Sequence, residues 1–319
     1  MAFSGNQCTG NRMTQTRLAE IVSITAYDGQ KISLTGEFYL RGFANFGIAQ
    51  TQYITQKGYK QIGETVRDFT LGSRTIPLSI FTIGNPSRLD YWTERSRLIN
   101  LFRANRGLNR LNQLTLTIRL EDDTHYSIDG FYAGGLEFQD NNDSRNDFAI
   151  ETVVNFYCPN PIWRKTTQLS ISPSGGVAEE LVFPITFPIQ FASAGTFFNT
   201  GDLAYAGNWR SYPTITIDGP YTTLTLTIEP FGTSIFLNEA IGTSEQRILT
   251  LSETGFTIVD QNGDDAFSDL NSGNLVDFYI RPSDQIESGE TQRITANLLN
   301  GSEGVSGATF AYYENYIGL

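Results

Sequence analysis

Histidine occurs only once in this sequence of 319 residues, at His125. Cysteine is almost as rare, since Cys8 and Cys158 lie far apart and have no cysteine or histidine nearby at the spacing of a metal site. We therefore expect no disulfide framework and no protein-bound metal. Both thiols are expected to be buried or idle in the reducing compartment where such a chain folds.

Catalytic signatures are missing as well. A Ser/His/Asp or Cys/His site would need His125, which stands among acidic and polar residues where a hairpin turn is expected, and no G-x-S-x-G elbow occurs. The glycine-rich stretches "GDLAYAG" and "SGGVAEE" lack the lysine and the strand-to-helix context of a phosphate loop. We predict neither enzyme activity nor a cofactor. A glycosidase-type carboxylate pair stays open as an alternative, although nothing singles out a pair.

Long apolar runs do not occur. No stretch approaches the roughly 18 apolar residues of a membrane span. The start "MAFSGNQCTGNRMTQTR" lacks the apolar core of a secretion signal. We therefore expect no membrane insertion, and we expect the chain to fold in a cytoplasm.

Positive charge is scarce in the second half. Up to residue 165 there are 18 Lys and Arg against 16 Asp and Glu, whereas from residue 166 onward there are 4 against 18, which together make the net charge of -12. An acidic second half should repel duplex nucleic acid. The charge changes where "CPNPIW" stops a strand pattern, because Pro159 and Pro161 forbid a continuing central ladder. We predict two domains, 1–165 and 166–319.

The abundant pattern is alternation of apolar and polar residues, which is typical of strands with one wet face. The clearest runs lie at 32–40, 76–80, 114–120, 148–158, 181–191, 215–217, 224–228, 276–280 and 294–298. Turn dipeptides punctuate them: Asp28-Gly29, Asp129-Gly130, Asp218-Gly219, Asn262-Gly263 and Asn300-Gly301. Short strands at this spacing predict a mainly β chain with a sandwich or barrel in each half.

One segment has helical spacing instead. An N-cap candidate in Asn85 or Ser87, Pro86 at the first helical position and Gly107 as terminator predict a helix over about 86–106. Five apolar residues are expected on one side: Tyr91, Trp92, Leu98, Ile99 and Phe102. The arginines from Arg88 to Arg110 can be read as a solvated face, a contact with an acidic neighbouring subunit, or nucleic-acid contacts.

The segment 42–72 is polar, glycine-punctuated and too long for an ordinary loop, so we predict an extended hairpin or arm. The first 16 residues resemble a tail that orders only against a partner. The acidic stretches 140–147 and 260–269 are interpreted as solvated loops, with a cation site as the alternative for the second. Trp163 is interpreted as a packing plug, and Trp209 as core or a sugar-binding platform.

The order of these features resembles a known family. A strand "TIPLSIFTIG", the helix, "LTLTIRLEDDTHYSIDGFYAGGLEF" and "FAIETVVNFYCPNPIW" precede an acidic β-sandwich that begins towards "TGDLAYAGNWRSYPTITIDGP". This arrangement resembles the distal tail (Dit) proteins of long-tailed bacteriophages, most strongly from about 75 to 220. The departure from the family is an unusually acidic second half.

The resemblance implies a fold and a function. Its N-terminal domain would be a β-barrel with one helix and an arm that laps a neighbouring subunit, and its C-terminal domain a galectin-like sandwich. We expect a structural virion protein, a hexameric ring joining the tail tube protein to the tail hub or tip and to receptor-binding proteins. The alternative is a carbohydrate-binding two-domain β-protein. The predicted residues are Arg95, Arg103, Arg106, Tyr53 and Tyr59 for assembly, Trp163 for anchoring the domains and Trp209 for sugar.

Overall fold

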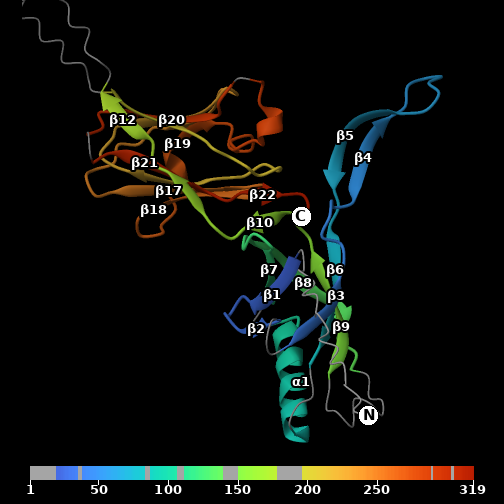
Figure 1. The fold of residues 1–319 in the computed structure, drawn as a ribbon. Helices are drawn as coiled ribbons and strands as arrows, with labels where there is room; N and C mark the ends of the chain where they lie inside the picture. The colour runs from blue at the N-terminus through green and yellow to red at the C-terminus, as the bar shows by residue number, and fades with distance from the viewer. Residues whose placement is uncertain are drawn as a thin grey trace, which may run out of the picture. The chain divides into compact units, whose positions relative to one another are not determined.

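Antiparallel strands dominate the structure, a computed structural model shown in Figure 1. It describes residues 19–34, 38–82, 87–105, 111–138, 150–177, 196–288, 290–302 and 305–319. The described residues contain one α-helix and two short 3-10 helices, so the prediction of a mainly β chain with a single long helix is confirmed. The N-terminal tail, the strand at 181–191 and the loop at 140–147 lie outside the described residues.

Contacts divide the chain into two compact units. Unit 1 comprises Met1–Ala44 and Thr75–Cys158, and unit 2 comprises Asn45–Arg74 and Pro159–Leu319. The second break falls at the proline stop, but the segment Asn45–Arg74 groups with unit 2, whereas the sequence pattern predicts an arm within the first domain. A division by contacts does not test independent folding, so the boundary between 165 and 166 stays a prediction.

Unit 1 is built on one antiparallel sheet of order β2-β1-β7-β8-β9-β6-β3. Alternate residues on its strands are buried, including Ile76, Leu116 and Phe156, as the period-two pattern predicts. The strands are β1 (Ala19–Ala26), β2 (Lys31–Ser33), β3 (Tyr39–Phe43), β6 (Arg74–Phe81), β7 (Leu114–Leu120), β8 (His125–Gly135) and β9 (Glu151–Cys158). Cys158 is buried, as expected. Cys8 lies outside the described residues.

The predicted turn at Asp129-Gly130 is wrong, because both residues lie inside β8. Gly130 is needed for close approach: a Cβ there would lie 2.5 Å from the carbonyl oxygen of Tyr157 and 2.6 Å from the ring of Phe156. An Asp-Gly pair can therefore mark a close approach of two strands instead of a hairpin turn.

Helix α1 (Arg88–Phe102) begins at Ser87, whose hydroxyl accepts a hydrogen bond from the backbone N–H of Asp90. It ends earlier than predicted, since the buried amide of Asn112 donates to the carbonyls of Leu101 (2.6 Å) and Arg103 (2.8 Å). Asn85, Pro86, Arg106 and Gly107 lie outside the described residues.

The buried stripe of α1 differs in part from the prediction. Leu98, Leu101 and Phe102 are buried, but Trp92 and Ile99 are each 45% exposed. The helix is shorter than predicted, and fewer of its apolar side chains are buried than the sequence implies. An apolar strip is therefore left on the outer face of α1.

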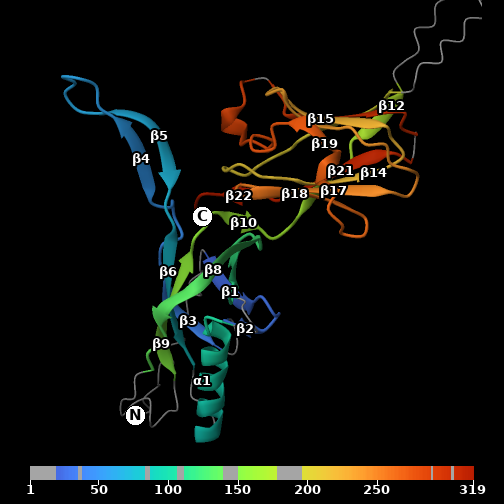
Figure 2. The ribbon, with the colours of Figure 1, turned by 180° about the vertical axis from the view of Figure 1, so that it is seen from behind.

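Unit 2 contains a two-sheet sandwich, seen from behind in Figure 2. One sheet has the order β11-β21-β14-β17-β18, and the other has the order β12-β13-β20-β15-β16-β19. The strands are β11 (Leu169–Ile171), β12 (Ser174–Val177), β13 (Thr196–Asp202), β14 (Thr214–Asp218), β15 (Thr223–Glu229), β16 (Thr233–Leu237), β17 (Gln246–Ser252), β18 (Gly255–Asp260), β19 (Leu270–Gly273), β20 (Arg293–Leu299) and β21 (Gly307–Tyr312).

One buried cluster joins the inner faces of these sheets, with Ile215 and Phe310 from the first and Leu226 and Ile294 from the second. Each such side chain contributes about 1.5–3 kcal/mol on removal from water. The predicted strand at 276–280 is wrong. Asn274 and Asp277 close a turn through their side chains there, so this segment adds no strand to the sheet.

Two further pairs of strands complete unit 2. The predicted arm forms an antiparallel hairpin of β4 (Thr51–Gln56) and β5 (Thr65–Leu71). Downstream of the proline stop, β10 (Trp163–Lys165) pairs with β22 (Asn315–Tyr316) near the C-terminus. The two 3-10 helices are η1 (Phe267–Asp269) and η2 (Ser283–Gln285).

Candidate assembly surfaces

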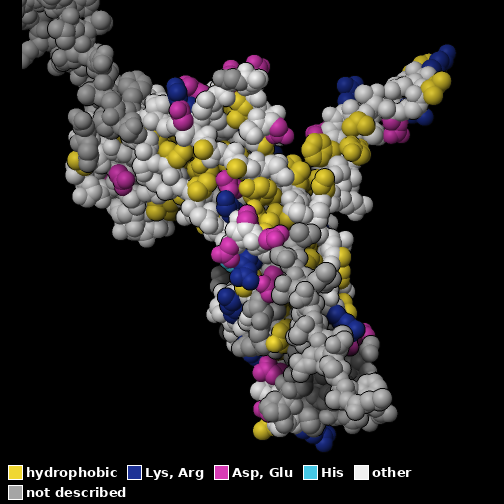
Figure 3. Space-filling view, viewed as in Figure 1, with side chains coloured by type: hydrophobic (Ala, Val, Ile, Leu, Met, Phe, Trp, Pro, Cys, Tyr) yellow, Lys and Arg dark blue, Asp and Glu magenta, His cyan; other side chains and the backbone are white. Residues whose placement is uncertain are grey.

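The hairpin of β4 and β5, called the arm below, presents apolar side chains to solvent. In the described part of the chain its strands pair only with each other. The predicted residues Tyr53 and Tyr59 are exposed, Tyr59 to 92%, and Ile62 at the tip is fully exposed. Apolar side chains are visible along the arm in Figure 3. A lone two-stranded hairpin is marginal in water, and exposed apolar side chains of this kind mark a candidate interaction surface.

Arg74 fastens the base of the arm. The side chain is 5% exposed, and its guanidinium donates to the carbonyls of Asn45 (3.0 Å), Phe46 (3.2 Å) and Ile317 (2.7 Å). It also lies 5.8 Å from the ring centroid of Trp163. Because a buried guanidinium needs acceptors for its donors, these carbonyls and Arg74 stabilise one another.

Trp163 is fully buried beside this arginine, with its ring 5.0 Å from that of Phe46 in an edge-to-face arrangement. The interpretation of Trp163 as a packing residue is thus confirmed. Its role as an anchor between domains stays a prediction, since the contacts named here all lie within unit 2.

The C-terminal residues close the same base. The backbone N–H of Leu319 donates to the carbonyl of Phe46 (3.1 Å), and that of Ile317 to the side chain of Asn208 (2.8 Å). A Cβ on Gly318 would lie 2.6 Å from the backbone of Gly47, so only glycine allows this approach. We call residues 45–47, Arg74, Trp163 and 317–319 the arm clamp. Sequence reasoning missed it because residues far apart in the chain form it.

Trp209 is half-buried, and its surroundings are polar and aromatic. Its ring lies 6.4 Å from that of Phe69 on β5, and its indole N–H is 3.4 Å from a carboxylate oxygen of Glu253. The arm thus contacts Trp209 through Phe69. The proposed sugar platform stays a prediction.

The outer face of α1 borders a groove of about 900 Å³ in unit 1. Trp92, Arg97 and Arg103 line it from the helix, and Lys31 lines it from β2. The floor is apolar and buried at Ile32. Cations around an apolar floor and an exposed indole suit an acidic protein segment.

Two of the predicted assembly arginines have different settings. Arg103 lines this groove, while Arg95 stacks on Trp92 (5.0 Å) and on Phe138 (4.4 Å). These cation-π contacts hold the Arg95 guanidinium close to the two rings. Arg106 lies outside the described residues.

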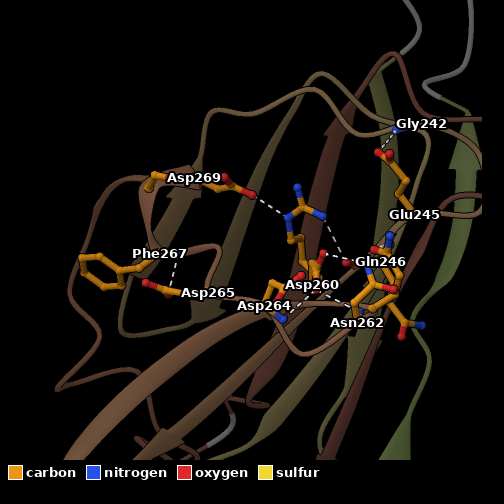
Figure 4. Close-up of polar contacts among 12 residues, drawn as sticks. Gly242, Glu245, Gln246, Asp260, Asn262, Asp264, Asp265, Phe267 and Asp269 are labelled. Atoms are coloured by element: carbon orange, nitrogen blue, oxygen red, sulfur yellow. Dashed lines mark hydrogen bonds and ion pairs between the residues drawn. The ribbon is translucent and has the colours of Figure 1, made fainter.

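Residues of the acidic loop at 260–269 make hydrogen bonds to one another, as Figure 4 shows. Asp260 accepts from the backbone N–H of Asp264 (2.9 Å) and of Asn262 (2.8 Å), and these bonds lower the pKa of its carboxyl. Asp269 is paired with Arg247. Among the described residues no group of three His, Cys, Asp or Glu side chains could hold a metal ion.

His125 begins β8 opposite Arg119 and is half-buried.

Helix α1, the one α-helix of the described residues, suits a membrane span neither in length nor in hydropathy. Two exposed surfaces stand out among the described residues: the apolar arm and the cationic groove beside α1.

No protein-family model and no curated protein matches the sequence. The fold is that of phage distal tail proteins. The chain matches the Dit protein of phage SPP1 with a TM-score of 0.59 and 13% identity over 94% of this chain and 99% of that one. That protein is described as a paradigm of the hub adsorption apparatus in phages that infect Gram-positive bacteria. A chain of the phage P2 baseplate in its activated conformation with Ca matches with a TM-score of 0.50 and 10% identity, over 92% and 97%.

Proposed function

We propose that this chain is a structural protein of a phage tail, located in the virion, that forms a hexameric ring between the tail tube and the tail tip. The observation that carries the proposal is the arm, whose apolar side chains are exposed on a hairpin without further strand partners among the described residues. The fold shared with SPP1 Dit along nearly the whole of both chains supports it.

Ring closure needs a heterologous interface, in which one surface of each copy meets a different surface of the next. The arm and the α1 groove are two such dissimilar surfaces. Each copy would lay its arm on a neighbour, and Arg95 and Arg103 would contact that neighbour or an adjoining tail protein. The tail tube protein, the hub or tip protein and receptor-binding proteins are the proposed partners, and folding takes place in the host cytoplasm.

No catalytic role is needed for this function. Ring interfaces obtain their energy from buried area and repeated contacts, so unusual side-chain chemistry is not required. We propose that the chain is not an enzyme. A turnover assay on cell-wall polysaccharides that yields product would contradict this.

Particle mass tests the ring directly. Mass photometry of the purified chain should give a defined oligomer, and electron microscopy should show a ring on tail tubes. Tyr59→Asp with Ile62→Asp should reduce the oligomer, because it charges the exposed arm tip, while Val276→Asp, also exposed but in the sandwich, should not. A chain that stays monomeric at high micromolar concentration and adds no density to tail tubes would overturn the proposal.

A further inference from the structure

Arginine and tyrosine side chains gather on one outer face of the sandwich in unit 2. An isolated antiparallel bridge joins Ser211 and Ile280, each donating its N–H to the other's carbonyl, at 2.9 and 2.8 Å. Both residues are buried. Since neighbours along an extended strand point to opposite faces, the four flanking residues share the outward side. We call them the Arg-Tyr platform: Arg210, Tyr212, Tyr279 and Arg281.

Ring contacts hold the platform in place. The guanidinium of Arg281 lies 3.8 Å from the ring centroid of Phe231 and 5.2 Å from that of Tyr279. The rings of Tyr212 and Tyr279 are 5.5 Å apart, and the guanidinium of Arg210 lies 5.6 Å from Tyr279. Arg281 is therefore preorganised, and a ligand that binds it need not order a free side chain.

Arg281 differs from the other cations of the acidic second half in its charge partners. From residue 166 onward the chain has four, of which Arg210 pairs with Glu253 (2.9 Å), Arg247 with Asp269, and Arg293 with Asp202 (2.8 Å). Within the described ranges no carboxylate lies at ion-pair distance from Arg281. Arg210 and Arg281 flank the bridge on its two opposite segments, so a bound carboxylate would reduce the repulsion between these two positive charges.

Unpaired donors lie beside it. Nε of Arg281 is buried and has no acceptor among the described residues. The same holds for Nε2 of Gln292, a residue only 2% exposed whose side-chain oxygen accepts from the backbone N–H of Arg281 (3.1 Å). Buried donors without acceptors are costly, so this pair of unpaired nitrogens is unusual for a native structure.

We propose that the Arg-Tyr platform is a binding site for a carboxylate carried by a sugar-sized ring, with a hexuronic acid as the chemical type. The planar fork of Arg281 matches a carboxylate. The half-buried ring of Tyr279 gives the C–H face of a saccharide an apolar contact, and the hydroxyls of Tyr212 and Tyr279 can bond its hydroxyls. Because the surrounding unit is acidic, it repels polyanions such as phosphate polymers. A ligand with a single negative charge is therefore favoured.

The test uses the full chain labelled with fluorinated tryptophan and titrated with D-glucuronate, D-glucose and acetate. The chain has three tryptophans, of which Trp209 shares the Glu253 carboxylate with Arg210. Glucuronate should shift the Trp209 fluorine signal and leave Trp92 and Trp163 unmoved. Glucose, which lacks the charge, and acetate, which lacks the ring, should each bind about tenfold more weakly.

Substitution of Arg281 completes the test. Arg281→Gln should weaken glucuronate binding about tenfold or more, and Arg281→Lys should recover little of it because the ammonium has no planar fork. Arg293→Gln is the matched control, since it removes an arginine of the same sandwich that already has a carboxylate, and it should bind glucuronate normally. Thermal unfolding shows whether each variant is folded. If Arg281→Gln fails to fold, Arg281→Lys decides the point.

Three results would overturn the proposal: no shift with glucuronate, equal binding of glucose, or normal glucuronate binding by Arg281→Gln and Arg281→Lys. The site does not depend on ring formation. Particle mass measured on the same samples therefore separates a failed binding site from a failed ring.

Discussion

Arg74 shows at the scale of one residue how a long side chain stabilises backbone that has no strand partner. We predict that Arg74→Met lowers the free energy of unfolding by about 3 kcal/mol, since charged hydrogen bonds are lost and carbonyls are left unpaired. Chemical denaturation of the variant measures this. Arg67→Met is the control, because Arg67 is exposed on the arm and bonds the side chain of Gln56 (2.9 Å). Equal stability of both variants would contradict the arm clamp.

Tyr221 gives a prediction about pH at the same scale. Burial raises the pKa of its phenol above the ordinary value of 10.0. The unfolded chain therefore releases this proton first, and the stability from neutral Tyr221 is complete below pH 10 and is lost as pH rises above it. The loss approaches about 1.4 kcal/mol per pH unit for one group.

We expect Tyr221→Phe to resist alkaline unfolding better than the unchanged chain and to differ little from it at neutral pH. Denaturation midpoints between neutral pH and pH 11 test this, where the upper end is about one unit above the phenol's ordinary pKa. Tyr59→Phe is the control, because Tyr59 is 92% exposed. An unchanged alkaline midpoint in Tyr221→Phe would show that its ionisation does not limit stability.

At the scale of elements, the C-terminal residues hold the arm. Removal of 317–319 takes away the N–H donors of Ile317 and Leu319 and the carbonyl that Arg74 binds. We predict faster amide hydrogen exchange in 45–74 after this truncation, while exchange in β14, β15 and β20 is unchanged, because local opening follows local contacts.

Gly318→Val should give the same pattern at full length, since its side chain meets the backbone of Gly47. Gly255→Val is the matched control, because a Cβ at Gly255 meets no atom within 4 Å and its backbone does not have a positive φ. Exchange in 45–74 that equals that of the unchanged chain would show that the arm is held by other contacts.

For the whole molecule, charge in the α1 groove should affect association. We predict that Arg103→Glu reduces the fraction of assembled particles, corresponding to about 1–3 kcal/mol per interface, because it places a like charge where an acidic segment is expected. Arg88→Glu is the control, since Arg88 is exposed on the same helix but does not line the groove. Mass photometry at several salt concentrations measures both. Identical oligomer fractions would remove the groove from the interface.

Local sequence patterns predict most of the strands. Period-two alternation places Ile76, Leu116, Ile215 and Leu226 in buried strand positions, and the proline stop ends β9 at Cys158, because strand geometry and proline chemistry are local. The composition of 42–72 likewise predicts the arm, on which Tyr53 and Tyr59 are exposed. A polar, glycine-punctuated segment has too little apolar content to build a core of its own.

Which distant residues meet depends on how the sheets pack. Gly130 sits inside β8 because of Phe156 on another strand, and α1 ends at Phe102 because Asn112 returns to cap it. The arm clamp and the Arg-Tyr platform join residues more than sixty positions apart, and Arg281 is distinctive only for the partners it lacks in space. Neither a close approach nor the pairing of a charge can be derived from spacing along the chain, because both depend on how the sheets fold back on one another.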